Sequence, residues 1–455
     1  MIQSLQELLG SSFVITDEER LVPFSKDETH GLAPVMPCGV VKPENASQVS
    51  EILKLCVKHQ TFLTPRGAGT GKSGGCVPVN GGWVMDFSRM NRILEIDAEN
   101  LKAVVEPGVV LADLQAAVDG KNLFYPPDPA SLTGCTLGGN VAENAGGPSA
   151  LKYGVTKDYV LGLEVVLPTG EIVRMGKNTV KGVTGYDLTA LMCGSEGTLG
   201  IVTQITLKLL PKPKTCQTAL LIFETAVGAA KSVSAILAAG ILPRSLEYVD
   251  QISLAAGRHH EVWKQFPSNA KAALIVEVDG DEEESVLNVL SKAVLVAESF
   301  DLQTSWVAQN QKERQAIWGA RRILSESVKR LKKHKISEDI VVPRSRMAEL
   351  VEKFEQWGKA HGLLTCAFGH AGDGNLHAQI LFDDPSEQAK VEELLKTLFL
   401  ETLALGGTLT GEHGIGVAKK PYLAMEQSRD LIALQWRIKK AFDPLGILNP
   451  GKFLP

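Results

Sequence analysis

The sequence predicts an α+β protein with more than one domain, and two observations carry this prediction. At 455 residues the chain is longer than one ordinary domain. The order of predicted strands and helices also changes at Pro211-Lys-Pro213. This segment breaks both helix and sheet and is therefore a predicted linker. Short strands follow one another before this linker, whereas strands alternate with helices after it. The second pattern is typical of an antiparallel sheet that carries its helices on one face.

The composition indicates an ordinary soluble protein. Charged residues make up 22% and hydrophobic residues 44% of the chain, which excludes wholesale disorder. The net charge of −5 gives no reason to expect nucleic acid as a partner. Seven scattered cysteines, none spaced Cys-x-x-Cys, fit a reducing cytoplasm and exclude an internal iron–sulfur cluster of the usual spacing. We find no signal peptide and no apolar run that could span a bilayer, so we expect a cytoplasmic protein, with peripheral association at the inner membrane face as the alternative.

Before the linker, amphipathic helices are predicted over residues 1–9 and 47–60. In the second, apolar residues recur at helical spacing from Val49 to Val57, behind Ser47 as the expected N-cap. Alternating polarity then predicts strands at residues 83–87, 93–96, 103–106, 160–167, 171–175 and 199–207.

After the linker, the prediction is strands at 219–223, 246–249 and 272–278, with a helix at 226–239 and a long helix from Asp281. A basic stretch runs from Lys329 to Lys335. Such runs are usually solvated faces, and a docking site for a redox partner or an anionic membrane surface is the alternative.

A glycine-rich loop at residues 64–75 contains Gly71-Lys72-Ser73, as a phosphate-binding P-loop does. Arg66 stands where that motif requires its first glycine, so a P-loop nucleotide hydrolase remains only a minor alternative. The same loop has dinucleotide G-x-G-x-x-G spacing, yet no helical periodicity follows it. Successive small residues still expose backbone N–H groups that can bind phosphate oxygens. The competing interpretation is a flexible surface loop.

Three of the nine histidines lie beside carboxylates and glycines, in residues 368–377 and 411–414. Glycines 369, 372 and 374 allow tight turns that can direct His370 and His377 toward one point. With Glu412 these histidines form a candidate site for a divalent cation. The alternative is a pair of structural histidines, with Asp373 and Asn375 capping turns.

Several longer motifs resemble a known family. They are Arg66-Gly-Ala-Gly-Thr, Asp128-Pro-Ala-Ser, residues 138–147 (Gly-Gly-Asn-Val-Ala-Glu-Asn-Ala-Gly-Gly) and residues 194–200 (Gly-Ser-Glu-Gly-Thr-Leu-Gly). In this order and spacing they resemble the FAD-binding domain of the vanillyl-alcohol oxidase or p-cresol methylhydroxylase (PCMH) type. Residues 369–377, 411–414 and 448–452 resemble the FAD-linked oxidase C-terminal domain. The likeness is greatest to the subfamily that holds the FAD-linked polypeptide of glycolate oxidase, FAD-linked D-lactate dehydrogenase and D-2-hydroxyglutarate dehydrogenase.

The resemblance implies a PCMH-type FAD-binding domain over residues 1–213 and a substrate or cap domain with an antiparallel sheet over 214–420. It also implies a segment at 421–455 that returns to the FAD domain. The residues implied in FAD binding are Pro65, Arg66, Gly67, Ala68, Gly69, Thr70, Ser73, Gly74, Pro129, Gly139, Asn140, Ala142, Asn144, Gly146, Glu196, Gly197, Ile201 and Asn449. Some relatives tether the flavin through a histidine in the first glycine loop. This chain has Thr70 and no histidine there, so we expect non-covalent FAD.

The family pattern also implies the chemistry: His370, His377 and Glu412 would bind zinc or manganese, and His413 would be the catalytic base. The motif Trp318-Gly-Ala-Arg321 makes Arg321 the expected partner of the substrate carboxylate, with Arg322 as the alternative. Relatives that oxidise D-2-hydroxyglutarate carry an extra lysine where this chain has Ser337, with Lys335 nearby.

The expected activity is therefore FAD-dependent oxidation of a small 2-hydroxy acid, glycolate or D-lactate, to the 2-oxo acid. It would proceed by metal-assisted proton abstraction and hydride transfer to the flavin. The alternatives are a D-2-hydroxyglutarate dehydrogenase and a catalytically silent FAD-binding subunit of a larger oxidase. Expected partners are the hydroxy acid, an electron-acceptor protein or quinone, and a second copy of the chain in a homodimer.

Overall fold

The computed structural model describes residues 1–455, which form two compact units. The first comprises Met1–Gly146, Val155–Lys212 and Glu412–Pro455, and the second comprises Gly147–Gly154 and Pro213–Gly411. One boundary thus lies inside the predicted linker. Residues 147–154 were expected in the first domain and residues 412–420 in the second. The octapeptide belongs to the second unit because Lys152 and Tyr153 donate hydrogen bonds to Asp279 there, at 2.5 and 2.8 Å.

The first unit contains a four-stranded sheet in the order β1-β2-β4-β3. Its strands are β1 (Val14–Ile15), β2 (Gly39–Val41), β4 (Trp83–Asp86) and β3 (Leu63–Arg66), of which the last three run parallel. Helices α1 (Ile2–Leu9) and α3 (Ala46–His59) bury their apolar stripes in the same core. The N-cap of α3 is Asn45, whose side chain accepts from the Gln48 N–H at 3.0 Å. The expected cap, Ser47, is wrong because it already lies inside the helix.

A five-stranded antiparallel sheet completes this unit, in the order β5-β6-β10-β8-β9. The strands are β5 (Ile93–Asp97), β6 (Lys102–Val105), β10 (Ile201–Lys208), β8 (Val160–Val166) and β9 (Ile172–Gly176), each within a few residues of its predicted place. Burial alternates strictly along β10, so one face of the sheet covers the core. The remaining elements are α2 (Glu18–Leu21), α4 (Leu111–Asp119), β7 (Leu123–Phe124), α5 (Leu137–Glu143), α7 (Leu188–Met192), β11 (Leu210–Pro211), α16 (Leu423–Glu426) and α17 (Arg429–Phe442).

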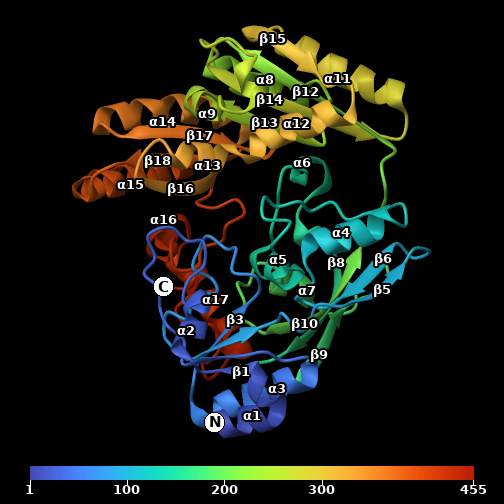
Figure 1. The fold of residues 1–455 in the computed structure, drawn as a ribbon, viewed down its shortest axis with the longest axis vertical. Coiled ribbons are helices and arrows are strands. Elements are labelled where there is room, and N and C mark those ends of the chain that lie inside the picture. Colours follow the sequence, from blue (N-terminus) through green and yellow to red (C-terminus); the bar gives the residue numbers. More distant parts are fainter. The chain divides into compact units, whose positions relative to one another are not determined.

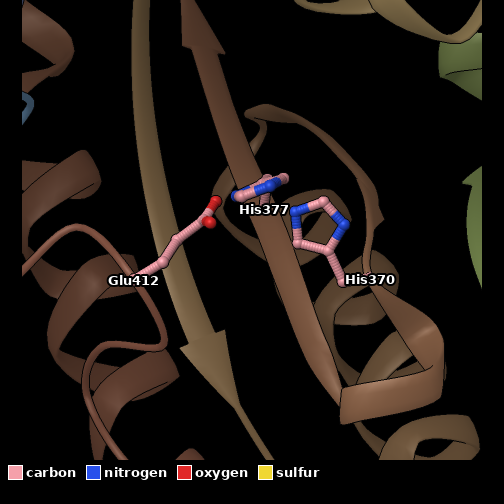
Figure 2. A group of neighbouring side chains, drawn as sticks. All are labelled: His370, His377 and Glu412. Atoms are coloured by element: carbon pink, nitrogen blue, oxygen red, sulfur yellow. The ribbon is translucent and has the colours of Figure 1, made fainter. Parts of the chain in front are cut away.

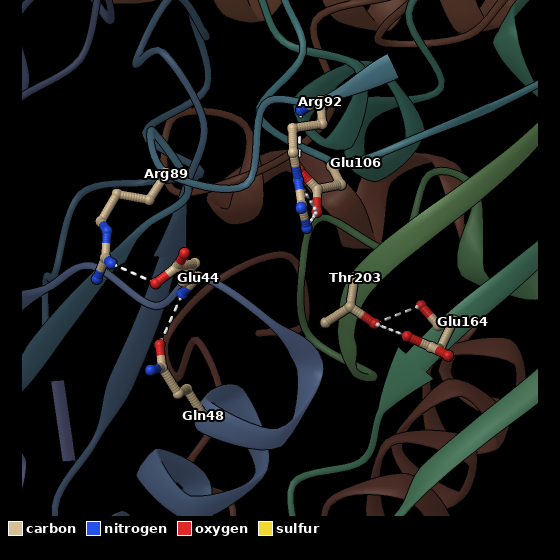
Figure 3. A network of polar contacts seen from close by, with 7 residues as sticks. All are labelled: Glu44, Gln48, Arg89, Arg92, Glu106, Glu164 and Thr203. Carbon is tan, nitrogen blue, oxygen red and sulfur yellow. Dashed lines mark hydrogen bonds and ion pairs between the residues drawn. The ribbon is translucent and has the colours of Figure 1, made fainter. Parts of the chain in front are cut away.

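Polar side chains fix the register of this sheet at two points (Figure 3). The carboxylate of Glu106, which is 4% exposed, accepts from the Arg92 backbone N–H at 2.8 Å and from its guanidinium at 2.7 Å. Thr203 donates its hydroxyl to the carbonyl and carboxylate of Glu164, where the pairing of β10 with β8 shifts register. The hydroxyl thus links β10 to β8 where their pairing is irregular.

The second unit is built on a seven-stranded antiparallel sheet in the order β15-β12-β14-β13-β17-β18-β16 (Figure 1). The strands are β15 (Leu302–Val307), β12 (Thr215–Phe223), β14 (Ala272–Gly280), β13 (Ser245–Asp250), β17 (Leu364–Gly369), β18 (Asn375–Phe382) and β16 (His334–Val341). Its helices are α6 (Ala150–Tyr153), α8 (Ala226–Ala238), α9 (Gln251–Gly257), α10 (Glu261–Lys264), α11 (Glu283–Ala297), α12 (Gln311–Arg322), α13 (Leu324–Lys329), α14 (Met347–His361) and α15 (Gln388–Ala404).

Helices cover both faces of this sheet, so the expectation of helices on one face is wrong. Residues Ala272 to Asp279 of β14 are all buried, which requires cover above and below the strand. Leu220 and Ile222 of β12 pack in one core with residues of α9, α10, α12 and α13. Helices α8, α11 and α14 contribute no residue to that core. None of the helices in the molecule combines the length and the apolar character needed to cross a membrane.

Candidate active site

A cavity of about 400 Å³ opens in the first unit, walled largely by glycines and other small residues. The loop after β3, helix α5 and the segment before β10 contribute to its wall, together with Glu412 and His413. Of the residues implied in FAD binding, those that line it are Pro65, Arg66, Gly67, Ala68, Gly69, Thr70, Pro129, Gly139, Asn140, Ala142, Glu196, Gly197 and Ile201.

The other residues of that set, Ser73, Gly74, Asn144, Gly146 and Asn449, do not line the cavity. Asn449 supports it from behind, because its side-chain N–H groups donate to the carbonyls of Gly75 and Glu196 at 2.9 and 2.8 Å. Asn144 ends α5 in the left-handed region and accepts from the Lys157 N–H at 2.9 Å. These side chains hold the wall together.

The cavity wall suits a large polar cofactor. A Cβ atom at Gly67 would lie 2.4 Å from the hydroxyl of Thr136, and one at Gly197, whose φ is +66°, would lie 2.7 Å from Pro65. A side chain therefore does not fit at either position, and both leave uncovered backbone in the cavity wall. The hydroxyl of Thr136 and the side-chain amide nitrogen of Asn140 are buried without a protein partner. Buried polar atoms normally have partners, so these two are suited to a bound cofactor.

The guanidinium of Arg66 is engaged within the protein. It donates to the carbonyls of Lys26 and Pro23 at 2.9 and 3.0 Å and lies over the ring of Phe24. Arg66 thereby fastens the N-terminal segment to the glycine loop. No helix follows this loop before α4 begins at Leu111, so the strand–loop–helix order of a P-loop is absent.

Two buried carboxyl groups, Glu143 and Glu196, border the same cavity. Glu196 accepts from the backbone N–H groups of Ile415 and Gly416 at 2.8 and 2.7 Å. Burial nevertheless raises its pKa to about 7. One oxygen of Glu143 is buried without a partner, and burial together with the charge of Glu196 raises the pKa of Glu143 well above its usual value. Sequence reasoning missed Glu143, a lone carboxylate among small residues at the end of α5.

The histidines predicted to bind a metal lie at the junction of β17 and β18. His370 follows the last residue of β17, and His377 lies in β18 opposite Phe368. Gly374 allows the chain to turn between them, because its φ is +76° and a Cβ there would lie 2.0 Å from the Val342 carbonyl oxygen. The turn thus brings the two imidazoles together, with their ring centres 5.2 Å apart.

Glu412 completes this group. Its neighbour Gly411 donates its backbone N–H to Asp339 in β16, the strand beside β18. His370, His377 and Glu412 each offer a ligand atom, and these atoms lie within 4.8 Å of one another (Figure 2). Two imidazoles and one carboxylate suit Zn²⁺ or Mn²⁺ and leave coordination positions open for another ligand.

Behind His370 lies a carboxylate that sequence reasoning missed. Glu247 of β13 is 0% exposed and accepts from Nδ1 of His370 at 2.6 Å. Its other oxygen accepts from Nε of Arg321 at 2.8 Å and forms an ion pair with Nη2 at 2.7 Å. Burial alone would raise the pKa of Glu247, but the charges of His370 and Arg321 outweigh it and lower that pKa to about 2. A charged residue inside an apolar strand needs such partners, and that was the signal available in the sequence.

Of the two arginines considered for substrate binding, Arg321 is the one that lies toward the histidines. Besides its ion pair with Glu247, its guanidinium lies 4.9 Å from the ring centre of Phe368. Arg322 is exposed to solvent. Ser337, the position where some relatives carry an extra lysine, accepts from Gln379 at 2.8 Å. Lys335, two residues earlier in β16, donates to Ser325 at 2.9 Å.

The models of two known protein families match this chain. Residues 212–453 match the model of the C-terminal domain of FAD-linked oxidases, and residues 37–176 match that of an FAD binding domain. The chain belongs to the FAD-linked oxidase family. The expected FAD-binding domain and C-terminal domain are thereby confirmed, and the first of them supports FAD as the cofactor.

Relatives of this FAD-linked oxidase cover nearly its whole length. Glycolate oxidase subunit GlcD of Bacillus subtilis (strain 168) is 46% identical over 419 residues, 92% of this chain and 89% of that protein. D-lactate dehydrogenase of Anaerostipes hadrus is 34% identical, covering 99% of this chain and 96% of that protein. The solved structure of p-cresol methylhydroxylase with substrate bound superposes with a TM-score of 0.81 at 20% identity, over 99% of this chain and 95% of that one. At this identity it establishes the shared PCMH-type fold alone.

Proposed function

We propose that this chain oxidises a small 2-hydroxy acid, glycolate or D-lactate, to the corresponding 2-oxo acid, using non-covalent FAD and a divalent cation. The observation that carries the proposal is the convergence of His370, His377 and Glu412, with Glu412 and its neighbour His413 also lining the glycine-walled cavity. The activities named for the two relatives support the substrate class.

When bound, FAD accepts a hydride, and a divalent cation makes a neighbouring hydroxyl group more acidic. His370, His377 and Glu412 would hold the cation. His413 would take the hydroxyl proton as the C–H bond of the same carbon breaks and its electron pair leaves as hydride. Arg321, oriented by Glu247, would bind the substrate carboxylate.

A monocarboxylate is favoured over D-2-hydroxyglutarate. The position implied to carry the second carboxylate-binding lysine is Ser337, whose hydroxyl accepts from Gln379. Lys335 nearby donates to the carbonyl and the hydroxyl of Ser325. Ser337 thus offers no positive charge to a distal carboxylate, and the Lys335 ammonium group is hydrogen-bonded to Ser325.

Electrons must leave the reduced flavin after each turnover. The seven cysteines are all free thiols and include no Cys-x-x-Cys pair, so this chain has no iron–sulfur cluster of the usual spacing to receive them. An electron-acceptor protein or a quinone would then be the partner. The word "subunit" in the name of the Bacillus subtilis relative supports a protein partner.

An anaerobic visible spectrum of the purified protein tests the proposal. Glycolate, D-lactate, L-lactate and D-2-hydroxyglutarate are added in turn to the FAD-loaded protein. We expect glycolate or D-lactate to bleach the flavin band, chelation to abolish bleaching, and Zn²⁺ or Mn²⁺ to restore it. A yellow protein that none of the four acids bleaches would contradict the proposal and favour a silent FAD-binding subunit.

A further inference from the structure

The carboxylate of Glu247 occupies an unusual position for a charged group. It lies in β13, near the middle of the seven-stranded sheet, and is 0% exposed. Neighbouring side chains of the strand, Leu246 and Tyr248, are buried as well. A carboxylate in such a place is costly unless its charge is paired and its oxygens accept hydrogen bonds.

Each carboxylate oxygen of Glu247 serves a different partner. Oε1 accepts from Nδ1 of His370 at 2.6 Å, and Oε2 accepts from Nε of Arg321 at 2.8 Å and pairs with Nη2 at 2.7 Å. Strand pairing places Glu247 beside His370, because β13 pairs with β17 at Tyr248 and Gly369, one residue before His370. The contact with Arg321 connects β13 to α12, the helix that carries this arginine.

The hydrogen bond between Glu247 and His370 determines which nitrogen of His370 is available as a ligand. An ionised carboxylate accepts a hydrogen bond, so Nδ1 carries a proton and Nε2 is the nitrogen left to bind a metal ion. Figure 2 shows one ring nitrogen of His370 directed toward His377 and the other turned away from it. A carboxylate behind a histidine is the usual device for fixing the tautomer and ring orientation of a metal ligand.

The contact between Glu247 and Arg321 fixes the plane of the Arg321 guanidinium. Nε and Nη2 are held by Glu247, and the group also lies against the ring of Phe368. A guanidinium held at one edge keeps its other donors in a fixed orientation, which suits two-point recognition of a carboxylate. The long arginine side chain then loses little additional freedom when an anion binds.

We propose that Glu247 is a positioning residue that orients His370 toward the metal and Arg321 toward the substrate carboxylate, so that one buried side chain sets both binding functions. The inference rests on the proposed function and deepens it. Glu247 itself contacts neither the metal nor the substrate. Its replacement should therefore weaken both kinds of binding without removing a ligand of either.

The test compares Glu247→Gln with Glu277→Gln. Glu277 is a matched control, since it is 4% exposed, lies in the adjacent strand β14, and accepts from Thr218 and Trp318 rather than from His370 or Arg321. The first measurement is Zn²⁺ affinity by competition with a chelator, in the FAD-loaded protein without substrate. We expect Glu247→Gln to lower the affinity about 10- to 100-fold and Glu277→Gln to leave it within about twofold.

The second measurement is steady-state oxidation of glycolate at saturating Zn²⁺. Loss of orientation at Arg321 should raise KM for glycolate by a larger factor than it lowers kcat, because the arginine binds the carboxylate in ground and transition states alike. Unchanged Zn²⁺ affinity in folded Glu247→Gln, or an equal loss in Glu277→Gln, would overturn the inference. Should Glu247→Gln not fold, Glu247→Asp keeps the charge but shortens the reach, and the same loss of Zn²⁺ affinity is expected.

Experiment can reject the proposed function and the positioning role of Glu247 independently. If no hydroxy acid reduces the flavin, the proposed function fails while the Zn²⁺ competition still reports on Glu247. If glycolate is oxidised and Zn²⁺ affinity does not depend on Glu247, the function stands and the positioning role is refuted.

Discussion

Glu143 and Glu247 are both buried carboxyl groups, one bordering the glycine-walled cavity and the other behind the histidine cluster. Their pKa values move in opposite directions. Glu143 has one oxygen without a partner and another buried carboxyl nearby, and its pKa is raised. Glu247 touches an arginine and a histidine, and its pKa is lowered to about 2. The neighbouring groups, and not the depth of burial, therefore decide the charge of a buried acid.

The two regions also differ in how they are built. The cavity is walled mainly by backbone and small residues, with buried polar atoms such as the Thr136 hydroxyl left for a ligand. The histidine cluster is built from long side chains that orient one another, with Glu247 between Arg321 and His370. Substitutions in the cavity should therefore act on cofactor retention and stability. Substitutions in the cluster should act on metal binding and turnover.

The largest expected effect is at His413, the proposed base. His413→Ala should lower the rate of flavin reduction by glycolate about 10²- to 10⁴-fold, while FAD content stays at the wild-type level. Stopped-flow absorbance measures the rate. The control is His361→Ala on α14, where the imidazole Nδ1 is hydrogen-bonded to the Trp357 carbonyl group. Unimpaired flavin reduction in His413→Ala would remove the base assignment.

The next effect is at Lys439, a buried cation in the first unit that is paired as Glu247 is in the second. Its ammonium group donates to Asp443 at 2.5 Å and to the carbonyls of Thr198 and Leu448 at 2.7 and 2.9 Å. Lys439→Met leaves the buried Asp443 charge without its partner and should lower the free energy of unfolding by about 3–5 kcal/mol. Chemical denaturation measures it. Lys440→Met, at an exposed neighbour, should change it by less than about 0.5 kcal/mol.

A smaller effect is expected at the turn between His370 and His377. Gly374→Ala must accept both a φ of +76° and a Cβ position 2.0 Å from the Val342 carbonyl oxygen, whereas Gly362→Ala faces a φ of +67° in open space. The Gly362 variant should lose about 1 kcal/mol of stability. Gly374→Ala should lose clearly more, and also Zn²⁺ affinity. Equal melting temperatures for the two variants would show that this turn relaxes without disturbing the histidines.

The last effect, which is small near pH 5 and grows as the pH rises, concerns Glu143. Its folded-state pKa lies above the ordinary glutamate value of 4.5, so the folded chain binds more protons there than the unfolded chain. Stability must then fall as the pH rises above 4.5, by up to about 1.4 kcal/mol per pH unit until the folded-state pKa is reached. Glu143→Gln removes this pH dependence, so its stability gain over the parent should grow as the pH rises from about 5 to neutrality. Thermal denaturation of the cofactor-free proteins across this range measures the gain, and a gain independent of pH would show that Glu143 is ionised in the fold.

Sequence periodicity predicted half of the strands and the helices α1, α3, α8 and α11, because burial on one face produces a regular spacing of apolar residues. Helix α5 was missed, since Gly138 and Gly139 stand in its first turn and argue against a helix when the segment is read alone. A Cβ at Gly138 would lie 2.6 Å from Pro107, so close packing requires the glycine there. The place of residues 147–154 was also missed, because an ion pair 127 residues away fixes it.

The two-part organisation, the glycine loops and the candidate ligands His370, His377 and Glu412 could be predicted in advance, because motifs and local spacing are properties of the chain alone. Which side chains meet depends on the fold. It brought Glu247 to His370 and Arg321 across three elements, and it left Glu143 beside Glu196 without a cation. The physical reason is that the charge and orientation of a buried group depend on neighbours far away in sequence, which no local pattern records.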